Sequence, residues 1–185
     1  MGLKLLILGL VIVSPIAAFA QTAQKNTSPL ALGDRMLLYQ LAQEDMSEIN
    51  LAKLATEKST NPQVQSYANS ILDNDPTLGQ EAKIIAAQKK VTVPYIVDTE
   101  QKARFDRLSE LAGADFDKAY MQYEAQKQRQ DLQLVQQAAN ATQDQDVKNY
   151  AMNETPIVLK TAQTAKTIVS SLEPSTNENA HLIDL

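Results

Sequence analysis

The sequence predicts an all-α protein built from four long antiparallel helices. Apolar residues recur at helical spacing over four segments, each of about 25 to 30 residues. Very short polar turns join the first segment to the second and the third to the fourth, so each pair is expected to pack as antiparallel neighbours. A long connection separates the two pairs. Two tight hairpins joined by one long crossover form a ferritin-like antiparallel four-helix bundle, here with a short extra helix in the crossover.

The first two helices are defined by signals at their ends. The first is predicted over residues 34–58, with Asp34 as a candidate N-cap. The second begins at Pro62, because Asn61 can cap it and proline is favoured at the first helical position. The apolar stripe of the second helix extends to Ile85.

The crossover between the hairpins is predicted to be extended and then helical. Residues 91–97 are rich in β-branched side chains and include Pro94. No second strand is available to pair with them, so they indicate an extended connection rather than a strand. Asp98 or Thr99 then caps a short helix that Gly113 terminates.

The third helix is predicted over residues 115–141 and the fourth over residues 144–172. An internal repeat supports the two hairpins. The pattern Val-x-x-Tyr-Ala occurs at residues 64–68 and again at 147–151, each time near the start of the second helix of a hairpin. The two hairpins are therefore expected to be similar in construction.

Each of these second helices holds an internal proline, Pro76 in one and Pro156 in the other. An internal proline removes one backbone hydrogen bond and clashes with the preceding turn, at a cost of about 3 kcal/mol. The two prolines lie at similar distances from the start of their helices. They favour either a local bulge in each helix at the middle of the bundle or a simple bend of each helix around the core. The sequence leaves both interpretations open.

Residues 1–20 are predicted to be a secretory signal peptide. An apolar stretch at residues 5–13 follows a positively charged start, and Ala18-Phe19-Ala20 forms a small-x-small cleavage site. Nine helical residues cover about 14 Å, under half of the roughly 30 Å of bilayer hydrocarbon. We therefore expect cleavage after Ala20, no stable membrane insertion afterwards, and a periplasmic protein, with outer-membrane association left open.

The rest of the chain is expected to divide into three parts. Residues 21–33 are small and polar and predict a flexible N-terminal arm. Residues 34–172 form the predicted bundle. Residues 173–185 predict a disordered tail, because Pro174 and several polar residues end the helical pattern.

The composition excludes several classes of function. The 185 residues contain no cysteine and one histidine, His181, which argues against zinc sites, cysteine nucleophiles and Ser-His-Asp triads. Seventeen basic and 22 acidic residues give a formal charge of −5, which does not favour nucleic-acid binding. We therefore expect no enzyme activity, no cofactor and no nucleic-acid partner.

Polar residues interrupt the apolar stripes near the middle of the predicted bundle. They are Asp45, Asp75, Lys127, Asp131, Glu154 and Thr161. Inward carboxylates from several helices either build a metal site or are neutralised by salt bridges, for which Lys127 and Arg129 are candidates. Salt bridges or solvation are the expectation, because the Glu-x-x-His motif of di-iron bundles does not occur. If a hard cation does bind, the candidate ligands are Glu48, Asp75 and Glu154.

Three segments resemble the secreted bacterial family catalogued as domain of unknown function 4142. These are residues 46–55, residues 61–68 with Asn-Pro-x-Val-x-x-Tyr-Ala, and residues 111–121 with Gly-x-x-Phe-Asp-x-x-Tyr. The resemblance extends over about residues 32–172. Such proteins are often labelled outer-membrane or periplasmic proteins and are related to ferritin-like bundles, so the resemblance implies fold and compartment. The family has no established activity, and the resemblance implies no reaction.

The chain departs from the family pattern at three positions. Family members usually carry histidines in the second, third and fourth helices, and the positions aligned with this pattern are Asp75, Gln128 and Thr161. The glutamate at Glu48 is kept. If those histidines bind metal in relatives, the resemblance implies that this chain has lost the site or holds a harder, weaker one.

The expected function is that of a non-catalytic periplasmic helical-bundle protein with a binding or envelope-stress role. Two alternatives stay open. One is a metal-binding ferritin-like protein with a carboxylate-only site. The other is a partner-binding module of the cell envelope, which would use the glutamine-rich face of the third helix or the chain ends. A protein partner or a homo-oligomer is compatible with each of these.

Overall fold

The computed structural model describes residues 29–173, except the side chains of residues 74–78, and within them every regular element is a helix. Those helices are α1 (Leu32–Lys58), α2 (Pro62–Gln88), α3 (Thr99–Glu110), α4 (Gly113–Ala141) and α5 (Gln145–Leu172). The all-α prediction is confirmed. The predicted signal peptide, most of the arm and the tail from residue 174 lie outside the described residues.

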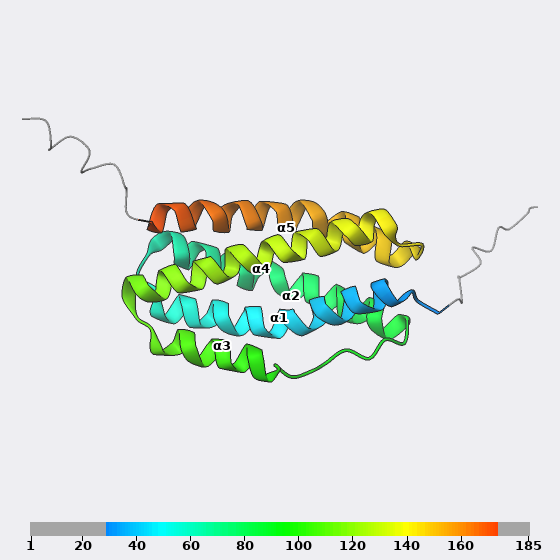
Figure 1. Cartoon of the computed structure of the whole chain (residues 1–185), viewed down its shortest axis with the longest axis horizontal. Helices are drawn as coiled ribbons and strands as arrows, with labels where there is room; N and C mark the ends of the chain where they lie inside the picture. Colours follow the sequence, from blue (N-terminus) through cyan, green and yellow to red (C-terminus); the bar gives the residue numbers. More distant parts are fainter. Residues whose placement is uncertain (1–28, 174–185) are drawn as a thin grey trace, which may run out of the picture.

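The four long helices lie side by side, with α3 along one edge (Figure 1). The most extensive contacts are within the hairpins, α1 with α2 and α4 with α5, while α1 with α4 and α2 with α5 join the hairpins. The extended connection and α3 return the chain along the bundle, so that α2 and α4 run in the same direction (Figure 1). None of the described helices combines the length and apolar character needed to cross a membrane.

Side-chain caps start three of the helices, and two of these caps, Asn61 and Asp98, are candidates that the sequence predicts. The Asn61 side chain accepts hydrogen bonds from the backbone N–H groups at the start of α2, and Asp144 does the same for α5. Asp98 and Gln101 form a reciprocal capping box at the start of α3. Each cap satisfies backbone donors that have no partner within the helix, which fixes where the helix begins.

The prediction that Asp34 caps the first helix is wrong. The helix begins two residues earlier, after Ala31, and no side chain caps it. Asp34 instead lies in the first turn, buried, where its carboxylate accepts a hydrogen bond of 2.7 Å from the Thr142 hydroxyl. That hydroxyl belongs to the turn between α4 and α5, so Asp34 serves as a contact between the hairpins. Sequence alone could not reveal this partner, because it lies 108 positions away.

The end of α3 also differs from the prediction. The helix ends at Glu110, two residues before the predicted end at Ala112, and the ammonium group of Lys58 in α1 donates to the carbonyl oxygens of Ser109 and Leu111. A cation on the last carbonyls of a helix is favourable because these groups have no partner within the helix. Gly113 is the first residue of α4 and has φ of +55°, a left-handed conformation that glycine adopts without strain.

Both internal prolines lie within continuous helices. The backbone is helical through Pro76 in α2 and through Pro156 in α5. Pro156 has no N–H group, so it cannot donate to the carbonyl one turn earlier, at Met152. The sequence left a bulge and a bend open at these positions, and both remain predictions.

The apolar core consists of two clusters, one toward each end of the bundle. The first includes Leu51, Tyr67, Phe116 and Tyr120. The second lies around Leu38 in α1, together with residues of α2, the crossover, α4 and α5. Along each helix, the buried charged side chains lie in the middle, between the residues that belong to the first cluster and those that belong to the second. Tyr67 and Tyr150, the tyrosines of the repeated Val-x-x-Tyr-Ala pattern, are both buried, since each is 2% exposed.

Candidate functional site

A set of buried polar side chains crosses the middle of the bundle, and we call it the polar belt. Its members are Asp45, Glu48, Glu124, Lys127, Gln128, Asp131 and Glu154, each no more than 8% exposed. Three helices, α1, α4 and α5, supply them. Buried charges are costly unless they are paired or neutralised, so the contacts within the belt determine what it can do.

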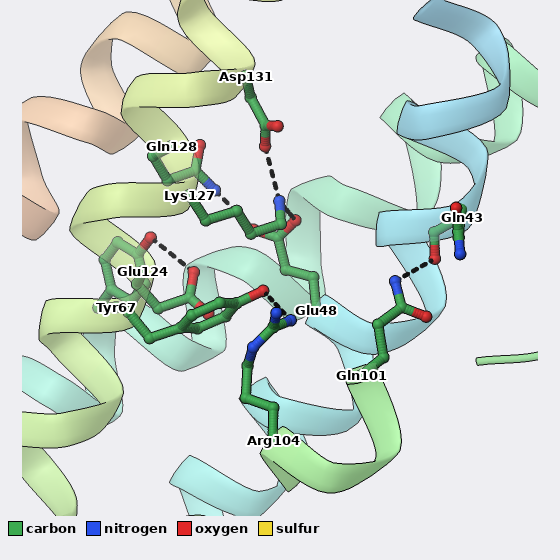
Figure 2. A network of polar contacts seen from close by, with 10 residues as sticks. Gln43, Glu48, Tyr67, Gln101, Arg104, Glu124, Lys127, Gln128 and Asp131 are labelled. Carbon is green, nitrogen blue, oxygen red and sulfur yellow. Dashed lines mark hydrogen bonds and ion pairs between the residues drawn. The ribbon is translucent and has the colours of Figure 1, made fainter. Parts of the chain in front are cut away.

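Lys127 is the cation at the centre of the belt. Its ammonium nitrogen contacts Glu48 Oε2 in α1 and lies 2.7 Å from Asp131 Oδ2, one turn along α4 (Figure 2). Gln128 donates to the other oxygen of Glu48 at 2.6 Å. Both oxygens of Glu48 are thus held by α4, and the predicted pairing of Lys127 with an inward acid is confirmed.

Glu124 is fully buried beside the first apolar cluster. Its Oε2 atom accepts a hydrogen bond of 3.2 Å from the Tyr67 hydroxyl, whereas its Oε1 atom is buried without a hydrogen-bond partner among the described residues. Burial, reinforced by the nearby charge of Glu48, raises the pKa of Glu124 to about 8. Glu124 is therefore mainly a neutral carboxylic acid at pH 7.

Asp45 and Glu154 occupy the α1 and α5 sides of the belt. Asp45 forms an ion pair with Lys83 of α2. The Oε2 atom of Glu154 is buried and accepts no hydrogen bond from the described residues. Burial and then the charge of Glu81 raise the pKa of Glu154 to about 7. Near neutral pH, Glu154 is thus about half protonated.

A small cavity lies against these groups. Its volume is about 50 Å³, and its charged lining residues are Glu44, Asp45, Glu48, Lys127, Asp131 and Glu154. A buried water requires a cavity volume of roughly 10 to 15 Å³, measured as the volume open to the centre of a water-sized sphere. The cavity therefore has room for a few waters or one hydrated ion, and a substrate of ordinary size does not fit.

Comparison with known proteins identifies the family. The family described as "Domain of unknown function (DUF4142)" matches residues 19–168, well over half of the chain. This chain is a member of the DUF4142 family. The resemblance seen in the sequence is therefore confirmed. No curated protein gives a significant match.

One solved structure shares the fold of this DUF4142 chain. It is described as a crystal structure of a DUF305 fragment from Deinococcus radiodurans, with a TM-score of 0.67 and 12% sequence identity. The alignment covers 78% of this chain and 99% of that one. At this level of identity the likeness concerns the fold, and it shows that a second group of proteins of unknown function uses a similar helical arrangement.

The candidate metal ligands of this DUF4142 chain are only partly brought together. Glu48 and Glu154 both line the cavity, as does Thr161. The side chain of Asp75 lies outside the described residues. Within the described part of the chain, no three histidine, cysteine, aspartate or glutamate side chains are grouped closely enough to hold a metal ion. The metal hypothesis therefore stays a prediction that solution measurements must test.

Two members of the belt, Glu124 and Gln128, are not among the polar interruptions that the sequence predicts to face inward. Glu124 lies one turn after Tyr120 and one turn before Lys127, so it continues the buried stripe of α4. Gln128, one of the positions where family members usually carry histidine, donates to Glu48. The helical period alone could have revealed Glu124. It could not have revealed that the carboxylate has one partnered and one unpartnered oxygen.

Proposed function

We propose that this DUF4142 protein is a non-catalytic helical-bundle protein of the periplasm with a binding role, and that its interior carboxylates are held by its own lysine rather than by a metal ion. The observation that carries the proposal is the position of Lys127, whose ammonium group contacts both Glu48 and Asp131 inside the polar belt.

An ammonium group at this point favours a metal-independent interior. The Lys127 nitrogen lies among the carboxylate oxygens that a divalent ion would need, and a second cation there would be repelled at short range. Each oxygen of Glu48 already accepts a hydrogen bond, one from Lys127 and the other from Gln128. A metal ion on Glu48 would have to compete with the Lys127 ammonium group for the same carboxylate.

The same features support a non-catalytic role. The cavity of about 50 Å³ has room for only a few waters, and its lysine is engaged in two ion pairs. The periplasmic part of the proposal rests on the predicted signal peptide at residues 1–20 and on the lack of cysteine, which suits an oxidising compartment.

The proposal extends to the fold. Two antiparallel hairpins, α1 with α2 and α4 with α5, are joined by one long crossover that contains α3, which is the connectivity of ferritin-like bundles. We propose that this chain is a ferritin-like bundle in which ion pairs replace the central metal ligands. A crystal structure with a different packing order of the four long helices would contradict this.

The test is a metal analysis of the protein. The protein is purified without chelator and its bound iron, manganese, zinc and calcium are measured by mass spectrometry, after which the same ions are titrated by calorimetry. The proposal expects far less than one ion per chain and no saturable heat. One equivalent of any of these ions would overturn it.

A second candidate function, a carboxylate-only metal site, is favoured by one observation. Glu154 Oε2 and Asp45 Oδ1 are buried oxygens without hydrogen-bond partners among the described residues, and both side chains line the cavity with Glu48. A hard cation bound partly through water would satisfy them. If the metal analysis returns stoichiometric calcium or manganese, and Glu154→Gln abolishes it, this second function replaces the first.

A further inference from the structure

The two helices of the second hairpin, α4 and α5, lie side by side along the bundle (Figure 1), and a cleft opens at the surface between them. It encloses about 440 Å³, and its lining includes Arg129 and Leu132 of α4 together with Leu159 and Lys166 of α5. None of the described residues that line it also lines the internal cavity. The cleft is therefore a surface feature distinct from the polar belt.

The cleft contains two cations, Arg129 and Lys166, and its other described lining residues are all neutral. Both side chains are exposed, and neither forms a hydrogen bond or an ion pair with any other residue that the structure describes. The sequence names Arg129 as a candidate partner for the inward acids, and this prediction is wrong, because Lys127 takes that role while Arg129 lies at the surface. Two cations without a neighbouring carboxylate attract an anion.

The same sign of charge extends over the exposed surface of the hairpin. On α4 after residue 117 and on α5 after residue 146, the exposed charged side chains are all cations, namely Lys118, Arg129, Lys160 and Lys166. The acids of these two stretches are buried in the polar belt, namely Glu124, Asp131 and Glu154. The whole chain has a formal charge of −5, so this positive surface is not a general property of the protein. An anion is thus favoured at this hairpin in spite of the net charge.

The rest of the lining indicates what else the ligand carries. Half of the lining residues are apolar, namely Ala125, Leu132, Leu159, Ala162 and Val169. Leu159 is 39% exposed, so a large apolar side chain in the cleft remains partly open to water. An inorganic anion would leave this surface uncovered, whereas an alkyl chain would remove it from water, which is favourable. A volume of about 440 Å³ lies within the range of small-molecule sites.

We propose that this cleft binds a free carboxylate ion that carries an alkyl chain, with the carboxylate on Arg129 and the chain against Leu132 and Leu159. The planar guanidinium group of arginine donates two parallel hydrogen bonds that match the two oxygens of a carboxylate. Lys166 adds a second positive charge to the same cleft. The proposal names a ligand class for the binding role proposed above, and it rests on that role.

The test is a titration with octanoate, below the concentration at which it forms micelles, followed by amide chemical shifts in nitrogen-15 NMR. Acetate has the same charge without the chain, and octylammonium has the chain with the opposite charge. We expect octanoate to shift the amides of Arg129, Leu159 and Lys166 saturably, and about tenfold or more tightly than acetate. Octylammonium should leave these amides unshifted. Absence of saturable shifts with octanoate, or equal affinity for octanoate and either control, would overturn the proposal.

Three variants locate the binding. Arg129→Gln removes the proposed partner of the carboxylate and is expected to weaken octanoate binding by about tenfold. Lys166→Gln removes the second charge and should weaken it by about threefold, as is usual for an exposed charge. Lys160→Gln is the control, because Lys160 is an exposed cation on the same helix that lines a different groove, and it should leave the affinity unchanged. Equal binding by wild type and Arg129→Gln, or equal weakening by Lys160→Gln, would contradict the assignment.

An anionic lipid in a membrane offers the same chemistry as a free alkyl carboxylate, and a second measurement separates the two sources. The protein is floated with phosphatidylglycerol vesicles, with phosphatidylcholine vesicles as the control. We expect it to float with neither. Flotation with the anionic vesicles, combined with no saturable shifts from octanoate, would overturn the proposal in favour of a membrane surface. Because the metal analysis is a separate measurement on the unliganded protein, failure of octanoate binding and failure of the proposed function are distinguishable.

Discussion

Gly79 in α2 lies directly against the side chain of Asp45 in α1. A Cβ atom added at Gly79 would overlap the carboxylate group of Asp45, so the two helices approach here because this residue has no side chain. The same Asp45 carboxylate forms the ion pair with Lys83. The close approach of α1 and α2 and the position of a polar-belt carboxylate therefore depend on one glycine.

Gly79→Ala is expected to destabilise the protein by about 1 to 3 kcal/mol, as is usual when a group is forced into a packed site. Its control is Gly33→Ala, because a Cβ atom at Gly33 meets nothing within 4 Å. There, alanine should stabilise α1 by up to about 1 kcal/mol through its higher helix propensity. Urea unfolding measures both changes. Equal stabilisation by the two substitutions would show that the contact with Asp45 is not tight.

The stability of the protein is expected to fall as the pH rises from about 5 to above 8. Folding raises the pKa of Glu124 to about 8 and that of Glu154 to about 7. The folded state therefore holds protons that the unfolded chain releases near its ordinary carboxyl pKa, and the free energy of unfolding decreases as these protons are lost.

Urea unfolding at pH 5.5 and pH 8.5 measures this dependence. We expect the free energy of unfolding to be lower at the higher pH by about 2 kcal/mol or more, since each unit of pKa shift corresponds to about 1.4 kcal/mol. Glu124→Gln should flatten the dependence because it keeps a neutral group in place. An unfolding free energy that rises over this interval would mean that Glu124 is ionised in the folded protein.

Tyr67 is expected to be among the most sensitive core positions. It is 2% exposed and packs edge to face against Tyr120, with ring centroids 6.3 Å apart. Tyr67→Ala should cost about 3 to 5 kcal/mol through the cavity it leaves. Tyr67→Phe should cost about 0.5 to 1.5 kcal/mol, because it removes the hydrogen bond to Glu124. Thermal and urea unfolding test both.

The matched control is Tyr95→Ala in the crossover, where the tyrosine is 77% exposed. This change should remain within about 0.5 kcal/mol of wild type. If Tyr67→Ala behaves like Tyr95→Ala, the placement of the first apolar cluster is wrong.

Much of the fold could be predicted from local sequence signals. Asn61 and Asp98 could be identified as candidate caps because a cap acts on backbone groups two or three positions away. Asp34 was assigned wrongly for the opposite reason. Its partner, Thr142, comes from the other hairpin, and nothing within a few residues of Asp34 signals the contact.

The candidate site was predictable only in outline. Polar interruptions of the apolar stripes correctly indicated that Lys127 and Asp131 face inward, because the helical period fixes which face a residue occupies. The period does not reveal which atoms meet across helices. That Lys127 contacts Glu48, and that one oxygen of Glu44 lacks a partner, depends on how α1 and α4 are rotated and spaced.

The most direct test of the central claim is a double-mutant cycle on Glu48 and Lys127, measured by urea unfolding at pH 7 in the presence of chelator. Lys127→Met leaves the Glu48 carboxylate buried without its cation and should cost about 3 to 5 kcal/mol, whereas the double variant with Glu48→Gln should recover most of that loss. This outcome would show that the lysine stabilises the interior carboxylates without a metal ion. Additive costs for the two substitutions, with no coupling between them, would contradict the account.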